Sequence, residues 1–122
     1  MRPEDRDAAL LWDMREAARE IREFTQGVKY ARFAADKMRR YAVERQIMVI
    51  GEAARQVSDG LKATHPEIPW KGIIGQRNVL AHEYGETLVE RIWLVAINNI
   101  PDLLQALDRL VPPVDWDDQS SL

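Results

Sequence analysis

The sequence predicts an all-α fold, an up-and-down bundle of four to five helices. Apolar residues recur at spacings of three and four over long stretches, which is the period of one face of a helix. The six glycines and six prolines gather at a few points and leave the stretches between them uninterrupted. The 122 residues suffice for one domain with its own core. We expect this domain to span residues 1–111 and a loose tail to follow at residues 112–122.

The first helix is expected from about Asp5 to about Phe24. Its apolar stripe consists of Leu10, Met14, Ala17, Ile21 and Phe24. A short helical turn should follow over residues 29–34. Asp36 is of the residue type that caps helix N-termini, so we expect the second helix to begin there and to run to about Leu61.

The second helix combines an apolar core stripe with a second stripe, the mixed stripe, on which apolar and charged side chains occur together. The core stripe is Val43, Ile47, Ile50, Ala54, Val57 and Leu61. On the mixed stripe, Arg45 and Glu52 are seven residues apart and could form an ion pair, flank a site or remain solvated. Gly51 costs about 1 kcal/mol relative to alanine in a helix interior. It indicates either the close approach of another backbone or a tolerated glycine.

Two more helices are expected in the remainder of the domain. Pro69 suits the first turn of a helix that Trp70 anchors and that Gly85 ends at its C′ position. Its buried side should consist of Ile73, Ile74, Leu80 and Ala81. Thr87-x-x-Glu90 reads as a capping box for a last helix over residues 88–110, and Pro101 should kink that helix without ending it.

Composition narrows the possible chemistry. The chain has no cysteine and two histidines far apart, so we expect neither a metal site nor any cofactor. The longest apolar runs are a few residues, and the N-terminus is charged, so we expect no membrane helix, no signal peptide and a cytoplasmic protein. A formal charge of −3 argues against nucleic-acid binding by bulk attraction. The cluster of Lys37, Arg39, Arg40 and Arg45 could still form a local basic site, although a solvated helix face is the alternative.

The segment from Gly75 to Gly85 contains the residues of greatest chemical interest. At about 100° per residue, Arg77 and Tyr84 fall on nearly one line of a helix, while Asn78 and His82 share a line rotated by roughly 100–140° from it. A single helix therefore points Arg77 and His82 at the same atom only if the arginine bends across. Two copies related by a two-fold axis could bring them together, because an isologous interface places each segment against its mate.

These residue types suffice to cleave RNA without a metal. Histidine can act as an acid or a base near neutral pH. Arginine presents a permanently charged fork that matches phosphate oxygens. The alternative is structural: His82 would satisfy a local hydrogen bond, and Arg77 would pair with Glu83 or Glu86.

The motif Arg77-x4-His82-x-Tyr84 resembles the signature of HEPN-domain proteins, and most closely that of the HepT-like ribonuclease toxins. The segment 49–54, Val-Ile-Gly-Glu-Ala-Ala, also resembles that family's pattern, as do the entry between Phe33 and Asp36 and the run from Trp93 to Pro101. The resemblance covers roughly residues 7–110, which is nearly the whole chain.

The resemblance implies a two-fold homodimeric, metal-independent endoribonuclease toxin whose antitoxin is a minimal nucleotidyltransferase. Arg77 and His82 would be catalytic, Asn78 would assist them, and Tyr84 would receive the AMP that silences the nuclease. RNA affinity would come from the cleft, with Arg45, Lys37 and Arg40 as candidate contacts. Two other readings are a non-catalytic HEPN module that binds a nucleotide or a nucleotidyltransferase, and a plain helical dimerisation domain.

Overall fold

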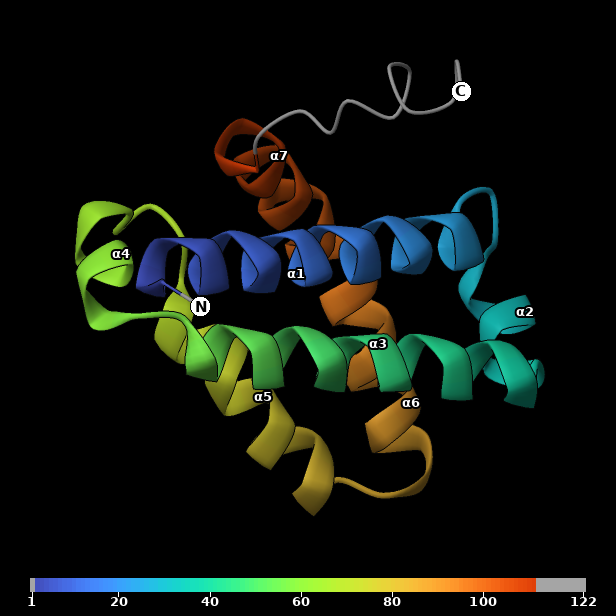
Figure 1. Ribbon diagram of the computed structural model, residues 1–122. Coiled ribbons are helices and arrows are strands. Elements are labelled where there is room, and N and C mark those ends of the chain that lie inside the picture. The colour runs from blue at the N-terminus through green and yellow to red at the C-terminus, as the bar shows by residue number, and fades with distance from the viewer. Residues whose placement is uncertain (1, 112–122) are drawn as a thin grey trace, which may run out of the picture.

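The computed structural model describes residues 2–111, which form helices and no strand (Figure 1). The elements are α1 (Pro3–Thr25), α2 (Tyr30–Ala35), α3 (Lys37–Gln56), α4 (Asp59–Thr64), α5 (Trp70–His82), α6 (Gly85–Leu94), the π-helical turn η1 (Val95–Asn99) and α7 (Ile100–Leu110). The all-α prediction is confirmed, although the chain is divided into more helices than the four to five expected. The tail expected at residues 112–122 lies outside the described part.

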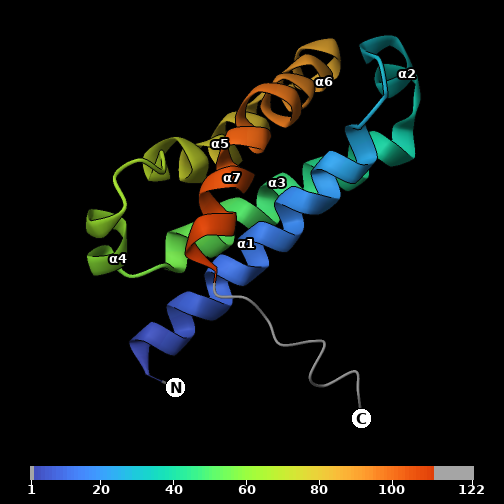
Figure 2. The ribbon, with the colours of Figure 1, turned by 90° about the horizontal axis from the view of Figure 1, so that it is seen from above.

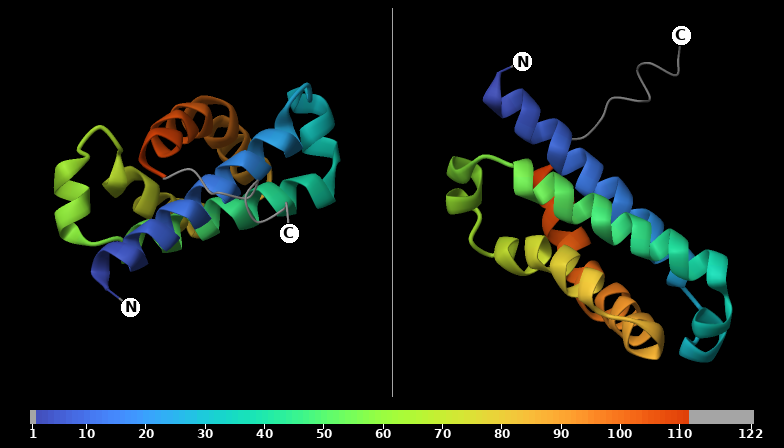
Figure 3. Two further views of the ribbon diagram at one scale, coloured as in Figure 1. Left: turned by 45° about the horizontal axis from the view of Figure 1, so that its top comes forward. Right: turned by 90° about the horizontal axis from the view of Figure 1, so that it is seen from below.

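The helices form two layers. α1 and α3 lie side by side and antiparallel, and α5, α6 and α7 cover one face of that pair (Figures 2 and 3). The core lies between the layers and includes most of the predicted stripes. Its largest fully buried side chains are Phe33, Met14, Ile21, Ile68, Leu107 and Val43. Leu10 and Phe24 of the first stripe, and Leu61 of the second, are only partly buried against this core.

The second long helix ends at Gln56 and does not reach Leu61 as predicted. Ser58 begins the separate helix α4 as its N-cap, and its hydroxyl accepts a hydrogen bond from the backbone N–H of Leu61 at 3.2 Å. The buried carboxylate of Asp7 in α1 accepts hydrogen bonds from both the N–H of Ser58, at 2.9 Å, and its hydroxyl, at 2.6 Å. These bonds satisfy the backbone where α3 breaks. The start of α3 is as predicted, because Asp36 accepts a bond from the N–H of Arg39 at 3.1 Å.

The junction between α5 and α6 also differs from the prediction. α5 ends at His82 with Glu83 as its C-cap, whereas Gly85, with a φ of +58°, is the first residue of α6. Tyr84 is the N-cap of α6, without a side-chain cap bond, so the capping box predicted at Thr87 is wrong. A positive φ favours glycine, which explains why the glycine marks the turn although it belongs to the next helix.

The last helical stretch continues through Pro101, as predicted. Its irregularity lies in η1, just before the proline, and Pro101 occupies the first turn of α7. A proline has no N–H to donate and its ring clashes with the preceding turn, so a local π turn accommodates it.

At Gly51 the backbones of α3 and α5 approach each other closely. A Cβ at this position would lie 3.3 Å from the carbonyl oxygen of Ile73 and 3.9 Å from the Cβ of Arg77. Of the two interpretations of Gly51, the close approach of another backbone is therefore confirmed. The absence of a side chain at Gly51 lets α5 pack closely enough for Arg77 to reach α3.

Candidate active site

Helix α5 carries the polar segment and is fixed to the core at its start. Trp70 is 7% exposed, and its indole N–H donates to the carbonyl of His65 at 3.0 Å. Leu80 is buried, and Ile73 and Ile74 are half-buried, so these residues form the inner face of the helix. Ala81, expected on the same face, is exposed. The outer face presents Arg77, Asn78 and His82 to solvent.

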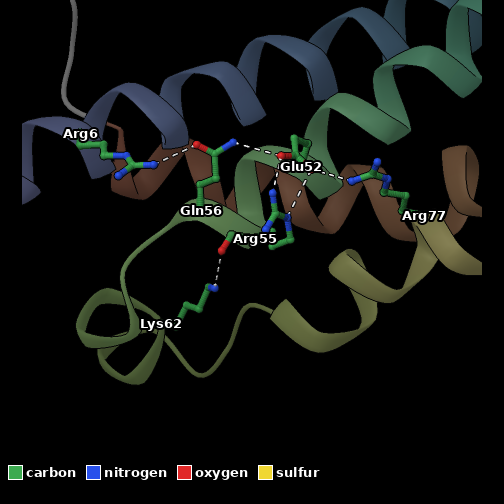
Figure 4. Close-up of polar contacts among 6 residues, drawn as sticks. All are labelled: Arg6, Glu52, Arg55, Gln56, Lys62 and Arg77. Atoms are coloured by element: carbon green, nitrogen blue, oxygen red, sulfur yellow. Dashed lines mark hydrogen bonds and ion pairs between the residues drawn. The ribbon is translucent and has the colours of Figure 1, made fainter.

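Arg77 lies over a hollow between α1, α3 and α5 and binds a carboxylate of α3. Its Nη1 donates to Oε2 of Glu52 at 2.7 Å (Figure 4). Three arginines, Arg45, Arg55 and Arg77, and two acids, Asp13 and Glu52, line this hollow of about 470 Å³, which we call the arginine hollow. The ion pairs of Arg77 with Glu83 or Glu86 that were the structural alternative are not formed. Glu83 instead lies 3.7 Å from Arg91.

Glu52 is the centre of a polar network that joins α1, α3 and α5 (Figure 4). Arg55 donates to both of its oxygens, at 2.7 and 3.4 Å, and Gln56 donates at 3.2 Å. Arg6 in turn donates to Gln56 at 3.0 Å. The hydrogen bonds from Arg55, then its charge, the hydrogen bond from Gln56 and the charge of Arg77, lower the pKa of Glu52 below its ordinary value and keep the carboxylate ionised.

His82 stands apart from this network. It is exposed at the last position of α5, and its ring forms no hydrogen bond or ion pair with any residue of the described range 2–111. The local hydrogen bond proposed as its structural role is therefore not formed within that range. The residues that line the arginine hollow do not include His82 or Asn78. One copy of the chain thus places Arg77 and Arg45 in one hollow, with His82 five residues, or about 1.4 turns, further along α5.

Tyr84 is the most accessible aromatic residue among the exposed large hydrophobic side chains. It is 79% exposed, and it lies in the short extended link between α5 and α6. Its side chain forms no hydrogen bond within residues 2–111, so the phenolic oxygen is open to solvent and to a partner.

The basic cluster is divided between two places. Arg39 pairs with Asp36 at 3.1 Å and donates to the carbonyl of Phe24, and Arg40 donates to the carbonyl of Ala34. Both arginines therefore hold the corner between α1, α2 and α3. Lys37 lies 5.7 Å from the ring centre of Tyr41. Lys37 precedes Glu52 by fifteen residues, or about 22 Å along α3, so within one chain it is remote from Arg77.

Arg40 lines a second hollow of about 650 Å³ between the start of α3 and α6, together with Tyr41, Gly85 and Glu86. Of the three candidate RNA contacts, only Arg45 shares a hollow with Arg77. The sequence places Gln56 on the mixed stripe of the second helix with Arg45 and Glu52, but it does not single out Arg55. The spacing of Glu52 and Arg55, three residues apart on one helix, was the signal that could have found Arg55.

No group of three or more His, Cys, Asp or Glu side chains in residues 2–111 is arranged to hold a metal ion. Over the same range, no helix is long and apolar enough to cross a membrane.

The fold and α5 define a class of small all-helical protein with an Arg-x4-His segment at its surface. Comparison with known proteins then identifies the family. Residues 14–110 match the family described as "Ribonuclease HepT-like". The chain belongs to this family, and it is accordingly a ribonuclease. No solved structure matches the chain.

Several relatives align with nearly the whole chain. It is 35% identical over 100 residues to the "Probable ribonuclease HepT" of Thermococcus cleftensis, an alignment that covers 82% of this chain and 91% of the relative. It is 34% identical over 100 residues to the "Putative RNase MJ1380" of Methanocaldococcus jannaschii, covering 82% of this chain and 92% of the relative. A second protein of that organism, "Putative RNase MJ0127", is 31% identical over 114 residues, covering 93% and 94%.

Proposed function

We propose that the chain is the toxin of a toxin–antitoxin pair and cleaves RNA without a metal ion, with Arg77 and His82 as its catalytic residues. The observation that carries the proposal is the outer face of α5, where half-exposed Arg77 uses only one N–H group, toward Glu52, and exposed His82 has no side-chain partner among residues 2–111. The unused N–H donors of Arg77 and the exposed ring of His82 are available to a substrate, and family membership supplies the substrate class.

The roles follow from the chemistry of the two side chains. An imidazole can remove the proton of the ribose 2′-hydroxyl or return one to the leaving oxygen. The guanidinium of Arg77 stabilises the phosphate oxygens as the 2′-oxygen attacks, because its charge is fixed and its N–H groups match their geometry. Asn78 lies between the two in sequence and is also exposed, so its amide can bind the same phosphate or the ribose.

A two-fold homodimer completes the proposed site. Within one chain Arg77 points into the arginine hollow and His82 does not line it. A second copy packed across α5 brings its own His82 toward Arg77, as the helical spacing predicts. The exposed apolar side chains on α3, α6 and η1, namely Met38, Tyr41, Leu94 and Ile97, offer surface for such contacts.

We propose that a nucleotidyltransferase antitoxin transfers AMP to the hydroxyl of Tyr84. The 79% exposure of this side chain and its place two residues after His82 support the assignment. An added phosphate beside the cleft would repel the substrate phosphate, and the adenosine would obstruct the RNA.

The test is cleavage of a labelled RNA in EDTA by the purified protein and by the variants Arg77→Ala and His82→Ala. We expect each variant to lose activity by about 100-fold or more, the usual contribution of a positioned acid or base for His82 and of a charge-stabilising donor for Arg77. Intact mass after co-expression with a minimal nucleotidyltransferase antitoxin should rise by the mass of AMP, and Tyr84→Phe should abolish that rise.

A wild-type protein without AMP that leaves all cellular RNA uncut would overturn the proposal. Nucleotide or nucleotidyltransferase binding that is unchanged in His82→Ala, without RNA cleavage, would then favour the non-catalytic HEPN module.

A further inference from the structure

The residue of interest is Glu52, which binds Arg77 across 25 positions of sequence. Arg77 is a long side chain that is half exposed, so on its own it would sample many orientations. The 2.7 Å bond to Oε2 of Glu52 selects one of them. A phosphate-binding arginine acts in the transition state only when it is held in position, since small misplacements reduce rates severely.

Glu52 is itself held before any substrate arrives. Arg55 binds it through two nitrogen atoms, and Gln56 binds the same Oε1 that Arg55 contacts at 2.7 Å (Figure 4). Arg6 extends the network from α1 to Gln56. The carboxylate is therefore a fixed point on α3, and the closeness of the helices at Gly51 sets its distance from α5.

The bond to Glu52 leaves Arg77 able to bind a phosphate. A guanidinium has five N–H donors, and within residues 2–111 the side chain of Arg77 makes no hydrogen bond other than the one from Nη1. The arginine hollow has three arginines and two acids along its lining, which leaves a net charge of +1. An RNA phosphate can thus bind Arg77 through its remaining N–H groups without displacing Glu52.

We propose that Glu52 is a positioning residue for RNA cleavage: it holds the Arg77 guanidinium at the arginine hollow, where the scissile phosphate of RNA binds. The inference rests on the proposed function, because it assigns a role to Glu52 through Arg77. It differs from a masking role, in which Glu52 would compete with the phosphate for Arg77 and would have to leave before catalysis.

The two roles predict opposite effects of Glu52→Ala in single-turnover cleavage of a labelled RNA by the full-length protein. A positioning residue predicts that the rate at saturating RNA falls by about 10- to 100-fold. RNA affinity stays the same or increases, because a negative charge beside the phosphate is removed. Glu52→Gln should recover part of the rate, since its amide oxygen can still accept a hydrogen bond from Arg77.

Glu16→Gln is the matched control. Glu16 is also a surface carboxylate in an ion pair, 3.3 Å from Arg19, and it lies on α1 outside the lining of the hollow. Its cleavage rate should stay within about two-fold of wild type, as for a surface ion pair of little energetic weight. RNA affinity is measured on the His82→Ala background, so that cleavage does not disturb the titration.

A cleavage rate for Glu52→Ala that is within about two-fold of the wild-type rate, or above it, would overturn the inference. The proposed function would remain intact in that case if the wild type cleaves RNA and Arg77→Ala does not. A fall in rate accompanied by an equal fall in affinity would also overturn it, because that pattern indicates damage to RNA binding. If Glu52→Ala fails to fold by circular dichroism, the rate and affinity of Glu52→Gln decide the question. A wild type that does not cleave RNA would remove the proposed function and this inference together.

Discussion

At the scale of single residues, the role assigned to Arg77 in the candidate site depends on which residue it binds. The sequence indicated which residue types carry the chemistry, and it offered nearby glutamates as structural partners for the arginine. The partner is Glu52, 25 positions away, and periodicity cannot predict it because the pairing depends on how closely two helices pack. Spacing placed Arg45 and Glu52 on one side of their helix, and both line the arginine hollow, although Glu52 pairs with Arg55 and Arg77.

Glu52 should titrate below the ordinary glutamate value of 4.5 because its ionised form is bound by Arg55 and Arg77. Arg55→Ala should raise the pKa of Glu52 more than Arg77→Ala does, since Arg55 makes two contacts with the carboxylate and Arg77 makes one. Carbon-detected NMR of the Glu52 carboxyl measures both values. The opposite order would show that Arg77 is its dominant partner.

Because the pKa of Glu52 is lowered, the sign of its effect on the pH dependence of folding stability is fixed. A carboxylate with a lowered pKa in the folded state contributes stability above its unfolded value, and this contribution is lost as the pH falls through the folded value. The difference in thermal stability between wild type and Glu52→Gln should therefore be largest at neutral pH. It should shrink only when the pH falls below 4.5, the ordinary pKa of a glutamate.

At the scale of secondary structure, the apolar period predicted the longer helices and most of the faces that they bury, because burial of a stripe is a local property of the sequence, but it did not predict the separate helix α4. The helix ends were harder to predict. α3 breaks at Ser58, where Asp7, 51 positions earlier, supplies hydrogen bonds that no local pattern reveals. The link between α5 and α6 was misassigned because a glycine of positive φ suits both the end of one helix and the start of the next.

The packing of α5 on Gly51 predicts a contrast between two glycines. Gly75→Ala should stabilise the protein by about 1 kcal/mol, because alanine favours a helix and a Cβ there meets no atom within 4 Å. Gly51→Ala should give no such gain, because its Cβ would press on the carbonyl oxygen of Ile73 at 3.3 Å and push α5 away.

Chemical denaturation of both glycine variants measures the contrast, and RNA cleavage should fall only in Gly51→Ala. An equal gain in stability for the two variants would mean that the α3–α5 contact is looser than 3.3 Å indicates.

At the scale of the whole molecule, the proposed site is divided between two copies, and this division can be tested by mixing inactive chains. A heterodimer of Arg77→Ala with His82→Ala contains one site in which Arg77 from one chain meets His82 from the other. We expect about half of the wild-type cleavage from this heterodimer and almost none from either homodimer, because activity follows the number of intact Arg–His pairs.

Co-expression of the two variants with different tags, followed by two affinity steps, isolates the heterodimer. Equal inactivity of the heterodimer and the homodimers would place both catalytic groups on one chain. A single chain in sedimentation analysis would exclude the two-fold arrangement altogether.

The π turn at residues 95–99 has a consequence for how this chain could tolerate changes in length. Such a turn holds one residue more than the α-helical path needs, and each residue rotates everything after it by about 100°. Deleting one residue within the turn would therefore restore a regular α-helix and leave Leu103 and Leu107 of α7 facing α1, whereas a deletion within α6 would rotate them away from it. The π turn thus absorbs one extra residue while the helical stretch on either side keeps its orientation, so this is the point of the stretch that should best tolerate the loss of a residue.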